Sequence, residues 1–432
     1  MDLPPGGHRR SLEEAFPRAA LSPLPMTNAF YPQRTDAGRR ISDAIQAMHD
    51  RDHDLRSFAW RLPRVSVIPE DIGPEGPLAG LAFGVKDVID VAGMPTRAGS
   101  LALPDAPKPF DAACVAQLRR AGAFPIGKTV TAEFAFTTPG PTRNPHGREH
   151  TPGGSSSGSA AAVAAGIVDM ALGTQTGGSI IRPAAFCGVV GFKPTFGRVH
   201  RGGMQVLCDS LDTIGWFTRT IAQSRAIAAV LTPSPALAGK GASPRFALLE
   251  CASLGALSVP AQDALRLCVQ HLRDLGAHLC TPALDTEIDQ LTALHAIIMR
   301  YELSRGLLPI LASAQAKVGQ AARDAMGQGL AIDHGRYVNA QRQRAEISAR
   351  WLDRFADVDF IVAPSAPGEA PKGLASTGSS IFNRLWSLLG WPCVHLPTGT
   401  GEHGLPVGVQ WIGKPDTDAT LLHWADLLHR GG

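Results

Sequence analysis

The stretch that decides the fold covers residues 151–198: TPGGSSSGSAAAVAAGIVDMALGTQTGGSIIRPAAFCGVVGFKPTFGR. It contains two glycine-rich turns that carry serine, residues 153–158 and 177–179. Glycine allows close backbone approach, so two such turns can direct amide N–H groups and serine hydroxyls into one cavity. Flexible linkers also combine serine and glycine, but a linker would not enclose apolar structured segments. No Gly-Lys-Ser/Thr follows the first turn, which argues against a phosphate-binding loop.

Two regular elements are predicted between these turns. The Ala-rich run 157–165 favours a helix, with Ser155 or Ser156 at its N-cap. Residues 169–174 are short and apolar, which predicts a buried strand. The predicted order of turn, helix, strand and turn returns Ser179 to the neighbourhood of Ser155.

The segment resembles the signature of the amidase signature family. These serine hydrolases cleave carboxamides through a Ser-Ser-Lys triad, and they include fatty acid amide hydrolase and the glutamyl-tRNA amidotransferase A subunit. The family's bridging serine and nucleophile lie 24 positions apart, as do Ser155 and Ser179. The resemblance therefore implies that Ser179 is the nucleophile and Ser155 the bridge. It also implies a cis peptide bond between Gly154 and Ser155.

Two positions depart from the family pattern. The family usually has Ile-Arg-x-Pro after the nucleophile, whereas here Ser179 is followed by Ile180, Ile181, Arg182 and Pro183. Gln175 stands where the family mostly has an acidic residue. Neither departure touches the three triad positions.

The third member of the triad is predicted in the stretch 78–100. An apolar, strand-like segment there delivers Lys86, which matches the triad lysine of the family. Burial disfavours the ammonium form and lowers the pKa of a lysine from its ordinary value of about 10.4, as a lysine base requires. Lys128 in the later GKTVTAEFAF stretch is interpreted instead as a structural or solvated lysine.

The remaining chemistry is predicted from the second turn. The backbone N–H groups of Thr176, Gly177, Gly178 and Ser179 are expected to form an oxyanion hole. A Ser-His-Asp triad is disfavoured because no G-x-S-x-G elbow surrounds either serine. Cys187 is disfavoured as a nucleophile because its apolar surroundings should raise the pKa of its thiol.

Composition limits the class of protein. The chain has 432 residues, 44% hydrophobic and 18% charged, and a net charge of +3, which is typical of a soluble globular protein without a nucleic-acid-binding surface. The seven cysteines are widely spaced and mostly flanked by apolar residues, which predicts reduced core thiols and a cytoplasmic location. No signal peptide, membrane span or metal-ligand cluster is evident, and no cofactor is predicted.

The predicted organisation is an N-terminal arm, residues 1–39, followed by one large α/β domain, residues 40–432. Strand, helix and strand patterns alternate, which predicts a central mixed, mostly parallel twisted sheet covered by helices, as in the amidase signature fold. Residues 285–355 have an almost wholly helical pattern and are interpreted as a helical insertion over the sheet.

The leading functional hypothesis is a stand-alone amidase that acts on a small-molecule amide, with ester or carbamate hydrolysis by the same acyl-enzyme route. The alternative is a glutamine-hydrolysing amidotransferase A-type subunit that works with a partner. Phe382 and Trp386 are predicted to contact the substrate, which favours the first hypothesis. Glutamine would instead call for a convergent Asp and Arg pair, and Arg182 and Arg384 are candidate members. A homodimer is left open.

Overall fold

The computed structural model describes residues 36–64, 76–234 and 244–429. Of the predicted arm, residues 1–35 lie outside this range, and residues 36–39 form the first turn of helix α2 (Asp36–Leu55). The helix buries Ile41, Ile45 and Met48, which recur at helical spacing.

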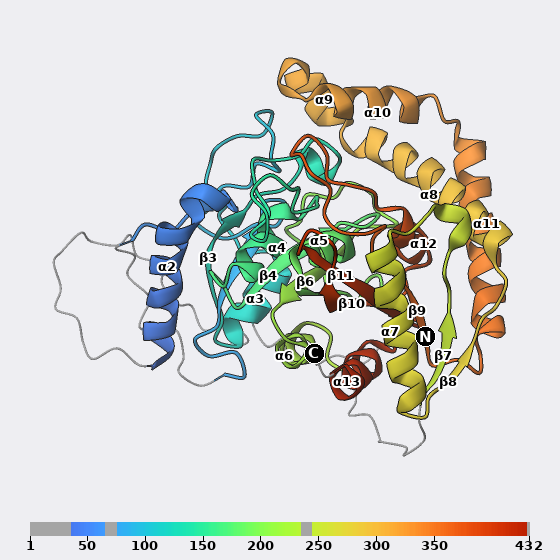
Figure 1. Cartoon of the computed structure of the whole chain (residues 1–432). Coiled ribbons are helices and arrows are strands. Elements are labelled where there is room, and N and C mark those ends of the chain that lie inside the picture. The colour runs from blue at the N-terminus through green and yellow to red at the C-terminus, as the bar shows by residue number, and fades with distance from the viewer. Residues whose placement is uncertain (1–35, 65–75, 235–243, 430–432) are drawn as a thin grey trace, which may run out of the picture. The chain divides into compact units, whose positions relative to one another are not determined.

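One mixed sheet forms the centre of the described chain (Figure 1). It has eleven strands in the order β1-β3-β2-β4-β6-β5-β10-β11-β9-β7-β8. Their bounds are β1 (Phe58–Arg61), β2 (Ala82–Lys86), β3 (Phe124–Thr129), β4 (Met170–Gln175), β5 (Val190–Lys193), β6 (Thr213–Thr218), β7 (Arg245–Leu248), β8 (His278–Cys280), β9 (Phe360–Pro364), β10 (Cys393–Thr400) and β11 (Pro406–Gly413).

The sheet is mixed, as predicted, but parallel pairing does not dominate it. The parallel pairs are β2 with β3, β2 with β4, β7 with β8 and β7 with β9. The other six pairs are antiparallel. Helical crossovers produce parallel pairs at both ends of the sheet, whereas a short connection such as that between β10 and β11 produces an antiparallel pair. The expectation of a mostly parallel sheet is corrected accordingly.

Helices cover the sheet, and the buried hydrophobic residues form three clusters. Helices α3, α6, α7, α8 and α10 to α13 contribute to the larger core cluster, and α2 and α4 contribute to a smaller one. Helix α5 contributes to both and to a third cluster of five residues. The bounds not yet given are α3 (Ala113–Arg120), α4 (Ser157–Ala164), α5 (Ile181–Cys187), α6 (Ile221–Leu231), α7 (Val259–Asp274), α8 (Asp285–Gly306), α9 (Leu308–Ala314), α10 (Gln320–Leu330), α11 (His334–Arg354), α12 (Ile381–Leu389) and α13 (Asp418–Leu428).

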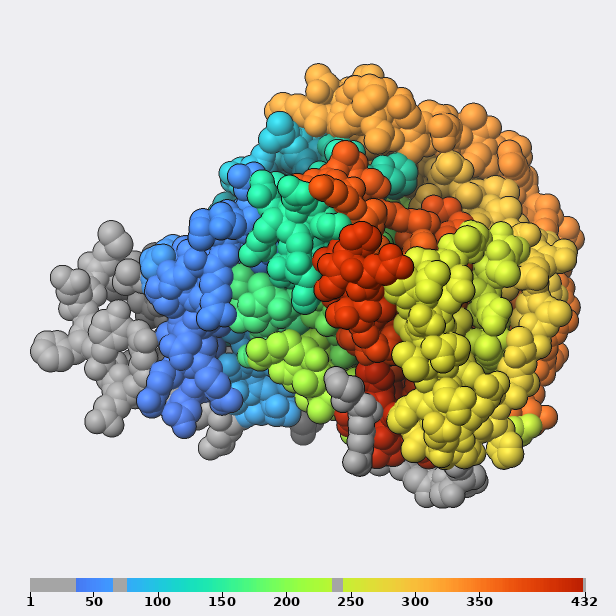
Figure 2. Space-filling model, viewed as in Figure 1, coloured from blue at the N-terminus to red at the C-terminus, as the bar shows by residue number. Residues whose placement is uncertain are grey.

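Helices α8 to α11 occupy the stretch predicted to be helical, residues 285–355. In the space-filling view, the side chains of α9 and α10 form the upper margin of the described chain (Figure 2). The turn before α10 is hydrogen-bonded to the segment that follows β3. The Gly319 N–H donates to both carboxylate oxygens of Glu133, at 3.1 and 3.0 Å. Glu133 also accepts from Ser100 Oγ at 2.7 Å. Glu133 therefore holds the turn before α10 against the loops that follow β2 and β3.

Lys128 has a structural role. Its ammonium group is fully buried and donates to Asp87 Oδ1 at 3.0 Å, to the Pro95 carbonyl oxygen at 2.9 Å and to Thr96 Oγ1 at 2.7 Å. Asp87 follows β2 directly, so the pair ties the ends of β2 and β3 together. Of the two predicted roles for Lys128, structural or solvated, this burial supports the structural one and rules out the solvated one.

We expect Lys128→Ala to lower the free energy of unfolding by about 3 kcal/mol, because it leaves a buried carboxylate without its partner. Urea unfolding measures this. The matched control is Lys108→Ala, whose partner Asp90 and own side chain remain 24% and 37% exposed; there the expected loss is below about 1 kcal/mol. Equal losses in the two variants would show that burial of the Lys128–Asp87 pair does not determine its contribution to the free energy of unfolding.

Candidate active site

Lys86 and Thr174 meet at one edge of the sheet because two parallel strands end there. β2 and β4 are paired with Val85 opposite Leu172, so their carboxyl ends share an edge. β2 ends at Lys86, and Thr174 lies one residue before the end of β4. Lys86 Nζ lies 2.7 Å from Thr174 Oγ1 and 3.4 Å from the Thr174 carbonyl oxygen. In open α/β sheets, ligands bind beyond this edge.

Ser155 reaches the same edge from the turn before α4. The Gly154–Ser155 peptide bond is cis, as the family resemblance implies. Lys86 Nζ lies 2.8 Å from Ser155 Oγ. Gly158 lets α4 start this close to the sheet, because a Cβ there would lie 2.1 Å from a neighbouring backbone oxygen.

Ser156 locks the start of α4 onto β4. It holds the N-cap position, but its side chain makes no capping hydrogen bond within the helix. Its hydroxyl donates to the Thr174 carbonyl oxygen at 3.2 Å and accepts from the Thr174 N–H at 3.3 Å. Because Ser155 precedes it directly, these two bonds also hold Ser155 beside the end of β4.

The Lys86 amine is fully buried, and among the described residues it has no carboxylate in contact. Burial lowers the pKa of this amine to about 7; the more distant Asp212 acts in the opposite direction, and Arg182 adds to the lowering. An ordinary lysine is almost wholly protonated at neutral pH. Lys86 is therefore poised to accept or release a proton there.

Asp212 is a site residue that the sequence analysis did not identify. Its buried carboxylate accepts from Thr176 Oγ1 at 2.5 Å and from the N–H groups of Leu207 at 2.6 Å and Cys208 at 3.0 Å. Burial raises the pKa of Asp212, and these hydrogen bonds oppose that shift. The carboxylate anchors Thr176 at the start of the second glycine-rich turn. The only available signal was its position in SLDTIGWFTRT, a stretch similar to the family pattern.

Ser179 lies in the second turn and lines a cavity of about 480 Å³. Thr176, Gly177 and Gly178 line it too, so the four predicted oxyanion-hole residues share one wall. Within the described chain, the N–H groups of Gly177, Gly178 and Ser179 have no protein acceptor. Ser179 Oγ makes no hydrogen bond to Ser155 Oγ in this part of the chain, so the structure joins Lys86 to Ser155 and places Ser179 in the cavity.

Gln175 stabilises the second glycine-rich turn through hydrogen bonds of its side-chain amide. Its side-chain oxygen accepts from the N–H groups of Ile180 at 2.8 Å and Ile181 at 3.0 Å. Its amide nitrogen donates to Ser387 Oγ at 3.0 Å, and that hydroxyl donates to the Gly177 carbonyl oxygen at 2.7 Å. An amide can fill both roles, since it carries an acceptor and donors without a charge to bury. The departure from the acidic family residue is thus accommodated by Ser387.

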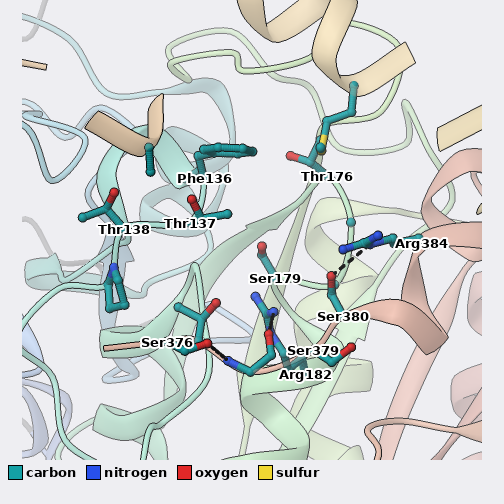
Figure 3. Close-up of a pocket in the computed structure, with 18 of the residues that line it drawn as sticks. Phe136, Thr137, Thr138, Thr176, Ser179, Arg182, Ser376, Ser379, Ser380 and Arg384 are labelled. Carbon is teal, nitrogen blue, oxygen red and sulfur yellow. Dashed lines mark hydrogen bonds between the residues drawn. The ribbon is translucent and has the colours of Figure 1, made fainter. Parts of the chain in front are cut away.

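Arg182 also lines the cavity, one position later than the family arginine. Its Nε and Nη2 donate to the Gly154 carbonyl oxygen at 3.1 and 2.5 Å, and Nη1 donates to the Gly378 carbonyl oxygen at 2.5 Å. It therefore braces the peptide group that carries Ser155. The close-up shows Ser179 above Arg182, with Arg384 to one side (Figure 3).

Phe382 and Trp386, the predicted substrate contacts, lie elsewhere. Both are almost fully buried in the larger core cluster, and neither lines the cavity. They share the core-facing side of α12, whereas Ser380 and Arg384 face the cavity. Phe382 and Trp386 therefore lie on the side of α12 that faces away from the cavity.

His295 is a cavity residue that sequence reasoning missed. Its Nε2 lies 2.9 Å from the Thr176 carbonyl oxygen, so this nitrogen is the donor. Burial lowers the pKa of His295 to about 4, which keeps the ring neutral at pH 7. The residue stands 119 positions away from Thr176 within a helical pattern, so no local signal could have indicated it.

Neither a metal-binding cluster nor a membrane-spanning helix is found among the described residues. They contain no group of three His, Cys, Asp or Glu side chains arranged to hold a metal ion. Across the same residues, no helix combines the length and apolar character that a bilayer-spanning segment needs. All seven cysteines are free, and all except Cys280 are buried.

Comparison with known proteins gives the family. The Amidase family model matches residues 44–239 and 257–422. The A subunit of glutamyl-tRNA(Gln) amidotransferase from Koribacter versatilis (strain Ellin345) is 32% identical over 450 residues, which cover 92% of this chain and 90% of that protein. An amidase crystal structure has a TM-score of 0.81 and 31% identity and covers 92% of this chain and 97% of its own.

A third protein is similar over the same length. It belongs to an inhibitor-bound vestigial protein complex that reveals the evolutionary origins of an s-triazine catabolic enzyme. Its TM-score is 0.80 at 27% identity, over 92% of this chain and 95% of that one. The matches cover nearly the whole sheet and both glycine-rich turns. The chain therefore belongs to the amidase family and has the amidase signature fold.

Proposed function

We propose that this chain is a stand-alone amidase that hydrolyses a carboxamide through an acyl-enzyme on Ser179, with Ser155 and Lys86 relaying the proton. The observation that carries the proposal is the 2.8 Å contact between Lys86 Nζ and Ser155 Oγ. Arg182, which lines the cavity together with Ser179, connects the two parts because it donates to the Gly154 carbonyl oxygen directly before Ser155. An amide carbonyl is a poor electrophile, so its hydrolysis needs an activated nucleophile and a stabilised oxyanion.

The proton moves along the three triad side chains. Ser179 Oγ attacks the carbonyl carbon, its proton passes to Ser155 Oγ, and the Ser155 proton passes to the neutral Lys86 amine. The relay then runs backwards and protonates the leaving nitrogen as the carbon–nitrogen bond breaks. Ser179 must approach Ser155 when the carbonyl is bound; catalytic hydrogen bonds commonly tighten only in the Michaelis complex. A water molecule repeats the sequence and releases the acid.

The oxyanion is assigned to the second turn. The N–H groups of Gly177, Gly178 and Ser179, which lack protein acceptors among the described residues, are available to the developing negative charge. Gly178 is required for the shape of the turn, because a Cβ there would lie 2.6 Å from Asn383 Oδ1. A side chain at this position would displace the donors.

The alternative is a glutamine-hydrolysing subunit that acts with a partner, and the name of the Koribacter versatilis relative favours it. The composition of the cavity favours the stand-alone amidase instead. Arg182 and Arg384 line it, but its described lining includes no Asp or Glu that could hold the ammonium group of glutamine.

The purified chain alone is expected to hydrolyse at least one simple amide or aryl ester, because the proposed triad, the oxyanion donors and the lining of the cavity all belong to this chain. A panel of aryl amides, fatty amides, carbamates and glutamine, assayed by product release, measures this. Glutaminase activity above all other activities, or activity that appears only with a co-purifying partner, would favour the amidotransferase alternative.

A further inference from the structure

The cavity beside Ser179 contains two guanidinium groups, from Arg182 and Arg384. Neither forms an ion pair within the described residues; Arg182 donates to backbone carbonyl oxygens, and Arg384 Nε donates to Ser380 Oγ at 3.3 Å. Burial lowers the pKa of Arg182 to about 9, and the charge of Arg384 contributes to the lowering. The two cations therefore repel each other across a partly desolvated space.

No acid relieves this repulsion in the cavity. Its described lining residues include no Asp or Glu. His295 is neutral at pH 7 and adds no charge. Buried charges in proteins are normally paired or hydrogen-bonded to an opposite charge. Among the described residues this positive charge is uncompensated, and a bound negative group would balance it.

Donors remain for such a group. A guanidinium carries five N–H donors. Arg182 uses three in its bonds to Gly154 and Gly378, which leaves two, and Arg384 uses one, which leaves four. Arginine presents these donors in a planar fork that matches a carboxylate.

Three serine hydroxyls from one loop add to the donors. Ser376 Oγ accepts from the Gly378 N–H at 3.1 Å, Ser379 Oγ from the Ile381 N–H at 3.3 Å, and Ser380 Oγ from Arg384. Since each oxygen acts as an acceptor, each hydroxyl proton stays available for donation. All three serines lie around the cavity near the two arginines (Figure 3).

We propose that this cavity selects amides that carry a carboxylate and disfavours amides with an ammonium group. The inference rests on the proposed function, because it names the substrate class of the same site. The carboxylate is held by Arg384, the free N–H groups of Arg182 and the serine loop, while the carboxamide reaches Ser179. A zwitterion such as glutamine brings an ammonium group toward two cations and finds no carboxylate among the described lining residues.

Three substrates of equal chain length test this. Glutaramate is glutamine without its ammonium group, and pentanamide has a methyl group in place of the carboxylate. The kcat/KM for glutaramate is expected to exceed that for pentanamide by about 30-fold, since hydrogen bonds to charged groups have this effect. The kcat/KM for glutamine is expected to be lower than for glutaramate by at least about 10-fold. Equal or higher values for pentanamide or glutamine would overturn the inference.

Variants locate the selectivity. Arg384→Gln is expected to lower kcat/KM for glutaramate at least about 10-fold more than for pentanamide, mainly through KM, and Arg384→Lys should restore part of the loss. Arg198→Gln is the matched control, because that arginine is likewise half-buried but lies outside the cavity. Equal losses for both substrates in Arg384→Gln would show that Arg384 does not recognise the substrate carboxylate.

Two further measurements separate this inference from the proposed function. Labelling of Ser179 by a fluorophosphonate tests the nucleophile without reference to charge. Calorimetry with Ser179→Ala tests glutaramate binding without turnover. If Ser179 is labelled but glutaramate is not preferred over pentanamide, only the proposed substrate class is refuted. Preferential binding of glutaramate without labelling refutes only the serine mechanism and retains the carboxylate site.

Discussion

Ser179→Ala is expected to lower kcat by about 10⁶-fold, the scale seen when a serine nucleophile is removed. The loss follows from chemistry alone, because the substitution removes one hydroxyl from a turn and no core volume. Thermal unfolding should therefore stay within a few degrees of the unmodified chain. Steady-state assays with the best amide substrate and mass spectrometry after fluorophosphonate treatment measure the two effects, and the adduct should appear on Ser179 only.

Ser157→Ala is the matched control for this experiment. Ser157 lies in the first glycine-rich turn, but its hydroxyl donates to the Val130 carbonyl oxygen at 3.4 Å and does not line the cavity. Its rate should remain within about 10-fold of the unmodified chain, since only a weak structural hydrogen bond is lost. An adduct on another serine, or turnover by Ser179→Ala near the original rate, would reject the assignment.

Lys86→Ala is expected to lower kcat/KM by about 10⁴-fold, the upper range for loss of a general base. In the unmodified chain, kcat/KM should rise with pH through an apparent pKa of about 7, because the proposed relay starts from the neutral amine. This limb should be missing from the residual activity of Lys86→Ala. The apparent pKa belongs to the coupled Ser-Ser-Lys set and not to a single atom. An unchanged profile in the variant would exclude Lys86 as the base.

The pH dependence of the free energy of unfolding gives an independent measure of the pKa of the Lys86 amine. The pKa of Lys86 is about 7 in the folded chain and about 10.4 when unfolded, so the unfolded chain binds more protons between these values. This group therefore makes the folded state more stable as pH rises from 7 to 10, by at most about 1.4 kcal/mol per pH unit. Comparison of urea unfolding for the unmodified chain and Lys86→Met removes the contribution of all other groups. Parallel pH profiles for the two proteins would contradict the lowered pKa.

The sequence predicted the residues whose signal is local. The two serine turns and the strand before Lys86 could be recognised because glycines, alanines and apolar residues stand at short, characteristic spacing. The predicted helix and strand between the two turns are confirmed as α4 and β4. The roles of Ser179, Ser155 and Lys86 in catalysis remain predictions.

The substrate side of the cavity could not be predicted in the same way. Phe382 and Trp386 were chosen because aromatic residues often contact substrates, yet they lie at helical spacing with Leu385 and Leu389, which indicates a core-facing side. His295 and Asp212 reach the site only through long-range folding. The proportion of antiparallel strands was also missed, because the order of strands in a sheet depends on which connections cross it and not on their local pattern.

The cavity is assembled from parts of the chain with different tasks. Lys86, Ser155 and Ser179 come from fewer than a hundred consecutive residues around β2 and β4, whereas His295 comes from α8 and Arg384 from α12. Exchange of the segment between residues 285 and 355 with that of a relative would replace one wall of the cavity and leave the reacting groups in place. This modular construction gives protein engineers a defined unit for recombination, with the Glu133–Gly319 contact as the junction to preserve.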